Sequence, residues 1–299
     1  MRAARFHEYG DPDVLVVEEA PEPHAGPGQV RVRVAATSVN PFDVKVRAGR
    51  LAAVVRVTFP VVPGSDATGV VDEVGEGVTG VSVGDTVFGL ARGGAAELAV
   101  LTAWAAVPAA WSTEQAAAAG LVSATALAGL AVLGDLAGRT LLVEGAGGGV
   151  GSAAVEIAVA RGATVVGTAS EAGHAFVRSL GAVPVTYGHG LAERVAAVAP
   201  QGVDAAFDTA GSGSLADLVA LVGDPSRVST VASSDAAAHG VTMVQGGADA
   251  AAHLPAAAAL GATGAYTPRV EAVYPLERIA QAHAHVAAGR TRGKVVVTL

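Results

Sequence analysis

The sequence predicts an α/β protein in which a doubly wound parallel sheet is inserted into a split, β-rich domain. Apolar strands alternate with helices between about residues 139 and 231, a rhythm that is typical of a parallel sheet. The first roughly 110 residues instead show strand alternation and glycine-rich turns. Residues 265–299 return to strands, so we expect the chain to rejoin the first domain near Arg292-Gly293-Lys294.

Length and composition limit the possible classes of protein. A chain of 299 residues can form about two domains, and we expect them to comprise residues 1–112 with 265–299 and residues 113–264. The net charge of −8 argues against a nucleic-acid partner. The absence of cysteine removes disulfides, thiolate nucleophiles and cysteine zinc ligands.

Two segments bear on the cellular location. Residues 1–15 carry charges throughout and have no apolar core, so they do not form a signal peptide. Residues 115–134 are uncharged and long enough to span a bilayer. They are mostly alanine and glycine, with leucines at helical spacing, so we expect buried core helices. No membrane partner and a cytoplasmic location are therefore predicted.

The first domain has strand patterns and then a helix start. Residues 30–34 alternate strictly between apolar and polar side chains, and 67–74 and 97–100 form further candidate strands. Ser112 is a suitable helix N-cap, and Gln115 stands three residues later, which completes a capping box.

The remaining elements follow in order. Strands are expected at 139–143, 163–168, 183–186, 203–208 and 226–231, and helices at 149–160, 172–180 and 213–222. The tail should form a strand at 270–273, a helix at 276–288 and a last strand at 294–299.

A glycine-rich turn joins the first strand of the inserted domain to its first helix. Glycines stand at 145, 148 and 151, after the apolar residues Leu141-Leu142-Val143. Glycine permits a tight turn, a close approach of backbone N–H groups to phosphate and tight helix packing. The helix N-terminus, at Gly149 and Val150, offers its unpaired N–H groups to an anion. The turn therefore predicts a dinucleotide site, although its GxxGxxG spacing also suits a plain turn in a chain with 39 glycines.

The end of the next strand predicts which dinucleotide is bound. An acidic residue that binds ribose hydroxyls is expected there, but the tip is Thr168-Ala169-Ser170. A carboxylate would repel a 2′-phosphate, whereas Ser170 and a cation can hold one. His174 and Arg178 stand four residues apart on one helix face. We therefore predict NADPH over NADH, with a solvated helix face as the alternative role of that pair.

The sequence resembles the zinc-independent quinone oxidoreductases of the medium-chain dehydrogenase/reductase superfamily. The match extends over nearly the whole chain and keeps the family's order. The stretches that carry it are Ser38-Val39-Asn40-Pro41-Phe42-Asp43, Arg47-Ala48-Gly49, Phe59 to Val71, Gly84-Asp85-Thr86-Val87-Phe88-Gly89, the glycine turn and Arg292-Gly293-Lys294-Val295-Val296.

The resemblance implies a GroES-like catalytic domain and a Rossmann-type domain, with the active site in the cleft between them. NADPH would deliver hydride to a quinone or an electron-poor C=C bond. Zinc-dependent relatives carry Cys or Gly-His-Glu where this chain has Asn40 and Gly64-Ser65-Asp66, so no metal is expected. His283 and His285, two apart on a helix, would face different directions. A homodimer is also implied.

The resemblance also assigns roles to individual residues. Asn40 and Thr125 would lie at the nicotinamide, Ser170, His174 and Tyr187 at the adenosine phosphate, and Arg178 on the same helix face as His174. The remaining cofactor assignments are Thr168 at the strand tip, Asp208, Thr209 and Ala210 at the ribose, Val231 and Ala232 beside the nicotinamide, and Arg292 and Lys294 near the cofactor entrance. Each has a structural alternative: Asn40-Pro41 as a turn, Tyr187 as a packed aromatic and Asp208 as a strand-end cap.

The chain departs from its relatives on the substrate side. Arg50 stands where a tyrosine is frequent, and Leu98 replaces another common tyrosine. Asn40, Asp43, Arg50 and Thr125 are therefore the candidate catalytic residues, and the proton donor is left open.

Hydride transfer to an already electrophilic acceptor needs alignment and exclusion of water, but no metal. Asn40, Arg50 or a ribose hydroxyl could stabilise the resulting enolate. A quinone, enone or enoyl reductase is the first hypothesis. The alternatives are a tailoring oxidoreductase of secondary metabolism with one specific substrate, and a catalytically weak NADPH-binding sensor or structural protein.

Overall fold

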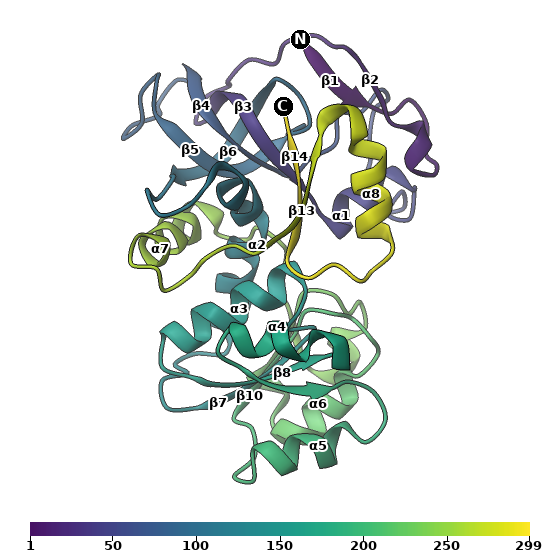
Figure 1. Cartoon of the computed structure of the whole chain (residues 1–299), viewed down its shortest axis with the longest axis vertical. Coiled ribbons are helices and arrows are strands. Elements are labelled where there is room, and N and C mark those ends of the chain that lie inside the picture. The colour runs from purple at the N-terminus through teal and green to yellow at the C-terminus, as the bar shows by residue number, and fades with distance from the viewer. The chain divides into compact units, whose positions relative to one another are not determined.

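The computed structural model describes all 299 residues, which form two compact units (Figure 1). Unit 1 comprises Met1–Leu121, Ala250–Ala262 and Pro268–Leu299, and unit 2 comprises Val122–Asp249 and Thr263–Thr267. The boundary thus falls at Leu121 rather than at residue 112, inside a continuous helix. Helix α7 (Ala250–Ala262) belongs to unit 1 because it packs on strand β6.

Unit 1 is built around a mainly antiparallel sheet. Its strands are β3 (Val30–Val39), β4 (Asp66–Val74), β5 (Thr86–Arg92), β6 (Leu98–Ala106), β13 (Val270–Pro275) and β14 (Lys294–Thr298), with the order β13-β14-β3-β4-β5-β6. An additional β3–β6 pairing closes the four strands β3 to β6 into a barrel. Strand β14 pairs with β3, so the tail does rejoin the first domain as the sequence predicts.

Shorter elements complete unit 1. Strands β1 (Arg2–Arg5) and β2 (Val16–Glu19) form an antiparallel pair. Helices α1 (Pro41–Arg47) and α8 (Ile279–Ala287) pack against each other. Helix α1 lies in a region for which the sequence predicts only strands and turns. It was not predicted because a helix of two turns is too short to show a clear apolar period.

Helix α2 (Thr113–Val132) begins with the predicted capping box. The backbone N–H of Gln115 donates to Ser112 Oγ at 3.2 Å, and the Ser112 N–H donates to Gln115 Oε1 at 2.8 Å. By length and composition α2 is the one helix that could cross a membrane, but 78% of its most apolar window is buried in the protein. This burial favours the predicted core helix.

Unit 2 contains a six-stranded, entirely parallel sheet. Its strands are β7 (Thr140–Glu144), β8 (Thr164–Ala169), β9 (Val183–Thr186), β10 (Ala205–Asp208), β11 (Val228–Thr230) and β12 (Thr242–Met243), in the order β12-β11-β10-β7-β8-β9. The doubly wound fold class predicted from the alternating elements is confirmed, and the order reverses between β7 and β10.

The helices of unit 2 connect these parallel strands. They are α3 (Gly149–Ala160), α4 (His174–Ser179), α5 (Leu191–Val198) and α6 (Leu215–Val222). Short 3-10 turns occur in the two units at 12–14, 171–173, 225–227, 236–239 and 276–278. Helix α3 has the bounds that the sequence predicts, whereas α5 and α7 were not predicted. The alanine-rich α7 has no distinct apolar face to reveal it.

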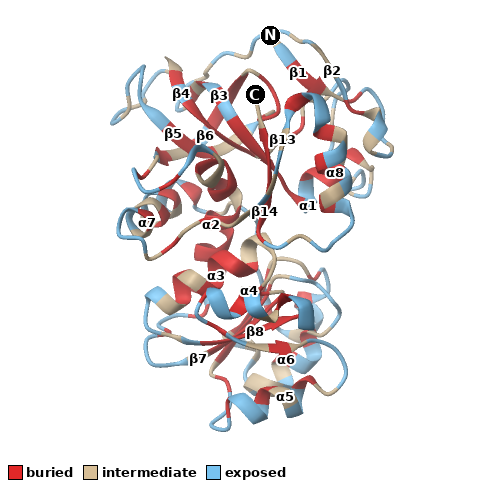
Figure 2. Cartoon of the chain, in the orientation of Figure 1, coloured by how far each residue is buried: buried red, intermediate tan, exposed pale blue.

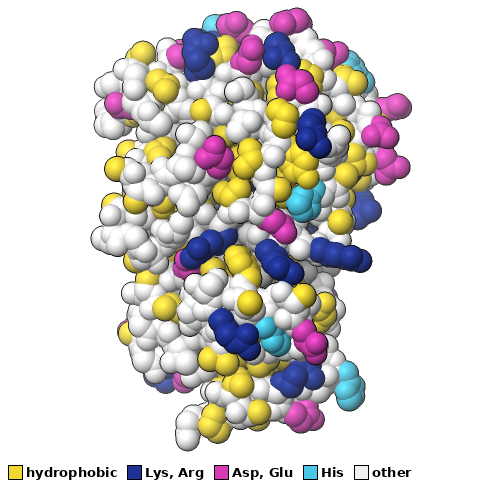
Figure 3. Space-filling model, viewed as in Figure 1, with side chains coloured by type: hydrophobic (Ala, Val, Ile, Leu, Met, Phe, Trp, Pro, Cys, Tyr) yellow, Lys and Arg dark blue, Asp and Glu magenta, His cyan; other side chains and the backbone are white.

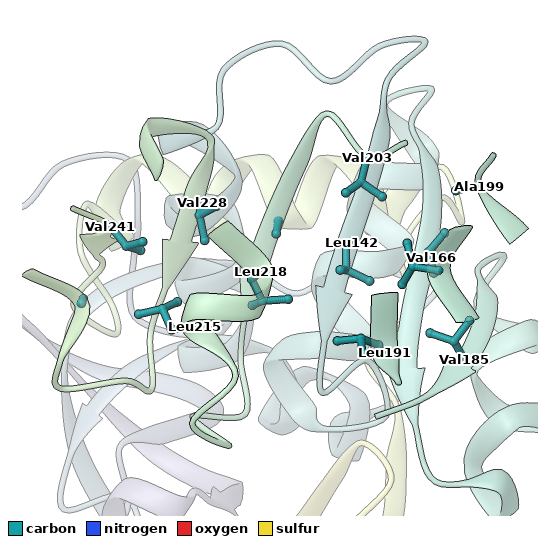
Figure 4. Close-up of a cluster of buried hydrophobic side chains, with 13 residues drawn as sticks. Leu142, Val166, Val185, Leu191, Ala199, Val203, Leu215, Leu218, Val228 and Val241 are labelled. Carbon is teal, nitrogen blue, oxygen red and sulfur yellow. The ribbon is translucent and has the colours of Figure 1, made fainter. Parts of the chain in front are cut away.

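The core of unit 2 is buried beneath these helices (Figure 2). Figure 4 shows side chains from strands and helices meeting in one cluster, including Leu142, Val166, Leu191 and Leu218. These residues are all below 5% exposed. Because all six strands are parallel, their carboxyl ends lie at one edge of the sheet.

Candidate functional site

The glycine turn between β7 and α3 has the geometry that its sequence predicts. Gly145 has a φ of +77° and lies against Thr209 and Ala210, so a side chain is excluded there for two reasons. A Cβ on Gly151 would collide with the carbonyl oxygen of Gly145. A Cβ on Gly147 would meet nothing within 4 Å, so the turn is open on that side.

Helix α3 begins at this turn without a side-chain cap. Gly148 is its N-cap, with extended backbone and no capping hydrogen bond from a side chain. The first-turn N–H groups have no acceptor within the helix, and the helix dipole adds positive potential at the same point. This open, uncapped N-terminus fits the pyrophosphate of a dinucleotide.

The tip of β8 brings together several predicted residues of unit 2. Thr168 Oγ1 accepts the Gly145 N–H at 3.0 Å and so holds the turn. Ser170 and Arg178 are exposed, and His174 Nε2 lies 3.4 Å from Thr186 Oγ1. Figure 3 shows Arg and His side chains over the part of unit 2 that holds α4 and α5.

The segment after β9 is held by an arginine that the sequence analysis did not single out. Arg194 donates from Nε to the Thr186 carbonyl at 2.8 Å and from Nη2 to the Tyr187 carbonyl at 3.3 Å. Its guanidinium also bonds the carbonyls of Gly188 and His189. Tyr187 is 53% exposed, so it is available for binding rather than packed as a core aromatic.

Two buried carboxyl groups end the neighbouring strands β7 and β10. Glu144 and Asp208 stand opposite each other in register, and each is 1% exposed. Burial raises the pKa of Glu144, and the nearby negative charge of Asp208 raises it further. Thr209 Oγ1 donates to the Glu144 carbonyl at 2.6 Å, which holds the chain after β10 against the glycine turn.

The remaining predicted residues of unit 2 lie after β11 and on α2. Val231 and Ala232 follow β11 directly and are partly exposed. Thr125 is 3% exposed, and its Oγ1 accepts the Gly247 N–H at 3.2 Å. The hydroxyl of Thr125 thus holds the segment before α7, a contact that its place in the sequence did not indicate.

In unit 1 the predicted residues Asn40 and Lys294 meet in a buried polar cluster. Lys294 Nζ donates to Asn40 Oδ1 at 2.5 Å and to the Val39 carbonyl at 3.3 Å. Asn40 Nδ2 donates to Asp66 Oδ2 at 2.7 Å. The Lys294 ammonium lies 3.8 Å from Asp66 Oδ2, and both side chains are almost fully buried.

Hydroxyl and backbone donors complete this cluster. Ser38 Oγ donates to Asp66 Oδ2 at 2.6 Å, and the Leu121 N–H of α2 donates to Asp66 Oδ1. Asp43 accepts the Asn40 N–H at 2.8 Å and the Ser65 hydroxyl at 2.6 Å. Burial raises the pKa of Asp43 and lowers that of Lys294.

The donor set of this cluster does not fit zinc. Asn40, Ser65 and Asp66 stand where zinc-dependent relatives have their ligands, but amide and hydroxyl groups are poor partners for that metal. The Lys294 ammonium beside Asp66 would also repel a cation. His283 is buried on α8, while His285 contacts Tyr274 and Glu271, and no cluster of three or more metal-ligating residues is found.

Two predicted residues of unit 1 lie apart from the cluster's hydrogen bonds. Arg50 is exposed after α1, and its N–H donates to the Lys45 carbonyl at 2.9 Å. Arg292 is exposed before β14, and its N–H donates to Glu271 at 2.8 Å. Lys294, two residues later, points its ammonium into the protein instead of presenting it to solvent.

The combination of a GroES-like barrel with a doubly wound sheet defines the medium-chain dehydrogenases/reductases. Residues 26–111 match the family model of the alcohol dehydrogenase GroES-like domain, and residues 180–297 match that of a zinc-binding dehydrogenase. The human quinone oxidoreductase is 30% identical over the whole chain and 98% of its own length. The chain belongs to the quinone oxidoreductase family of this superfamily, which is a family of oxidoreductases.

Other relatives extend this comparison. A rat quinone oxidoreductase is 39% identical over 61% of the chain and 57% of its own length. A mycobacterial structure complexed with NADPH superposes with a TM-score of 0.87, 29% identity and full coverage of both chains. Segments of Streptomyces polyketide synthases are 40–45% identical over 52–58% of the chain, but the chain spans only 3–8% of those proteins.

Proposed function

We propose that the protein is an NADPH-dependent reductase that delivers hydride to a quinone or an α,β-unsaturated carbonyl compound. The observation that carries this proposal is the open glycine turn at the uncapped N-terminus of α3, with a serine rather than an acid after β8. The mycobacterial structure that superposes over the full chain was solved with NADPH, which supports the same cofactor.

Different residues of unit 2 bind different parts of the cofactor. The N–H groups from Gly149 onward hold the pyrophosphate, and Ser170 with His174 receives the 2′-phosphate. Thr209 borders the ribose. When bound, the nicotinamide supplies the hydride.

Asn40 is the favoured group for stabilising an enolate. Both ends of its amide are engaged, Oδ1 by Lys294 and Nδ2 by Asp66, so its orientation is fixed. An amide nitrogen carries two hydrogens, which leaves one donor for a developing negative charge. Arg50 is exposed, so it is less constrained than Asn40 for this role.

The test is the loss of NADPH absorbance with a panel of quinones and enones, repeated with NADH. Turnover of simple acceptors with a lower KM for NADPH than for NADH is expected. A clear NADH preference would contradict the cofactor assignment. Tight NADPH binding without turnover of any acceptor would favour a sensor or structural protein instead.

An enoyl reductase of secondary metabolism is the second candidate. The likeness to polyketide synthase segments favours it, as does the loss of aromatic residues at Arg50 and Leu98. Enoyl thioesters should then give a much higher kcat/KM than quinones. Comparable values for the two acceptor classes would speak against this candidate.

We further propose a homodimer of cytoplasmic location. Light scattering should give twice the chain mass of 29.2 kDa, and a monomeric mass would refute the dimer.

A further inference from the structure

The two carboxyl groups that end β7 and β10 lie at the point where the strand order of the sheet reverses. Glu144 and Asp208 are directly opposite in the parallel register. In open α/β sheets the crevice outside the carboxyl ends at such a point is the place where ligands bind. The pair is therefore adjacent to the cofactor turn, which begins at Gly145.

Glu144 holds the segment that follows β10. Ser212 Oγ donates to Glu144 Oε1 at 2.7 Å, and Ser214 Oγ donates to Glu144 Oε2. The backbone carbonyl of Glu144 accepts the Thr209 hydroxyl and N–H. Residues 209–214 are thus fastened at both ends to the last residue of β7.

Asp208 fastens a second segment. Its Oδ1 accepts the N–H groups of Ala210 and Gly211, both at 2.9 Å. Its Oδ2 accepts the hydroxyls of Thr230 at 2.7 Å and Ser233 at 2.5 Å. Hydrogen bonds to Asp208 therefore hold the segment after β11, which contains Val231 and Ala232, next to the Glu144–Asp208 pair.

No cation compensates the two acids. The segments 140–152, 205–219 and 228–234, and the α2 residues 122–132, contain no Lys, Arg or His. The other charged residues on the packed elements are Glu156 on α3 and Asp217 on α6, both acidic. Two adjacent buried carboxylates without a counter-ion are unfavourable, so one group keeps its proton.

We propose that Glu144 is a positioning residue of the cofactor site, which in its protonated form pairs with the Asp208 carboxylate and holds the segments after β10 and β11 for NADPH. Ionisation of Glu144 places two like charges on adjacent strands, loosens both segments and adds negative charge beside the pyrophosphate. This inference rests on the proposed function.

The raised pKa of Glu144 agrees with this geometry, since burial and Asp208 both favour the neutral acid. Glutamine has the shape of the protonated acid and can donate to Asp208, but it does not ionise. Alanine removes both the charge and the contacts to Ser212 and Ser214. The two substitutions therefore distinguish the effect of Glu144 ionisation from the effect of losing its side-chain contacts.

The experiment measures the Kd of NADPH by fluorescence between pH 5.5 and pH 9. We expect wild-type affinity to weaken about tenfold or more as pH rises, which is 1.4 kcal/mol per tenfold change. Glu144→Gln should stay near the low-pH affinity, and Glu144→Ala should bind weakly throughout. Asp217→Asn, an exposed acid on α6, is the matched control and should follow the wild type.

A wild-type pH slope in Glu144→Gln would overturn the inference, as would wild-type binding by Glu144→Ala. A merely structural Glu144 would lower the melting temperature of Glu144→Gln and leave the slope unchanged. The titration of the NADPH phosphate is common to all variants.

If the wild type binds no NADPH at any pH, the proposed function fails. The positioning role is then decided by hydrogen exchange of the 209–214 amides. Their protection should fall with pH in the wild type and not in Glu144→Gln; equal pH profiles would overturn the role.

Discussion

The buried lysine of unit 1 allows a quantitative prediction. Lys294 Nζ lies 3.8 Å from Asp66 Oδ2, and the two side chains are 4% and 1% exposed. Replacing Lys294 by methionine keeps an unbranched side chain, which is one atom shorter, and removes its charge. The substitution therefore leaves the Asp66 carboxylate buried without its cation.

The magnitude follows from what Asp66 keeps. Removing one member of a buried ion pair costs about 3–5 kcal/mol. Asp66 still accepts hydrogen bonds from Ser38, Asn40 and the Leu121 N–H. The cost should therefore lie at the lower end of this range. We expect a loss of about 3 kcal/mol, or about 1 M in the urea midpoint for an m-value of about 3 kcal/mol/M.

Unit 1 can be followed separately because both tryptophans of the chain, Trp104 and Trp111, belong to it. Urea unfolding is measured by their fluorescence for Lys294→Met, Asp66→Asn and the double variant. The double variant removes both charges. Its loss of unfolding free energy should therefore be smaller than the sum of the losses in the two single variants. We expect a coupling free energy of about 2 kcal/mol.

Additivity of the two single effects within about 0.5 kcal/mol would refute the ion pair as the cause. Lys45→Met is the matched control, since Lys45 is the only other lysine and is exposed on α1. Its urea midpoint should equal that of the wild type. Equal losses in Lys45→Met and Lys294→Met would show that the effect is not specific to the buried cluster.

Three further predictions concern cofactor choice, pH and the glycine turn. Ser170→Asp should raise the Kd of NADPH about 10- to 100-fold by repelling the 2′-phosphate, with little change in the Kd of NADH. Ser170→Ala should not discriminate between the two cofactors. Fluorescence titration of each variant with NADPH and NADH measures both Kd values. Burial lowers the pKa of His283 to about 3, so below pH 6.5 the unfolded state binds the extra proton and stability falls. The loss is about 2 kcal/mol at pH 5, and His283→Gln should show a shallower pH dependence in calorimetry; an equal slope would contradict it. Gly151→Ala should lower the melting temperature because its Cβ collides with the Gly145 carbonyl, while Gly147→Ala, which faces open space, should not.

The sequence was sufficient where local patterns determine the structure. The apolar run of β7, the glycines and the spacing of α3 are contiguous, so the strand, the turn and the helix bounds could all be predicted. The Ser112–Gln115 capping box is likewise local. Helix α1 was missed because its determinants are Pro41 at the first turn and the bond from the Asn40 N–H to Asp43, not an apolar period.

The polar clusters could not be derived in the same way. Lys294 and Asn40 are 254 residues apart in the chain, and only the pairing of β14 with β3 brings them together. The pairing of Glu144 with Asp208 depends on the register of β7 and β10. One signal was available, since Glu144 is a charged residue at the end of an otherwise apolar buried strand.

Each unit therefore buries a carboxyl group next to a predicted site residue, but the two are stabilised differently. Asp66 has the Lys294 ammonium beside it, and burial lowers the pKa of that ammonium. Glu144 has an acid as its neighbour and is stabilised by retaining its own proton, a state that is lost as pH rises through its raised pKa. An alkaline loss of cofactor affinity that originates in the ionisation of Glu144 should be removed by Glu144→Gln and should persist in Lys294→Met.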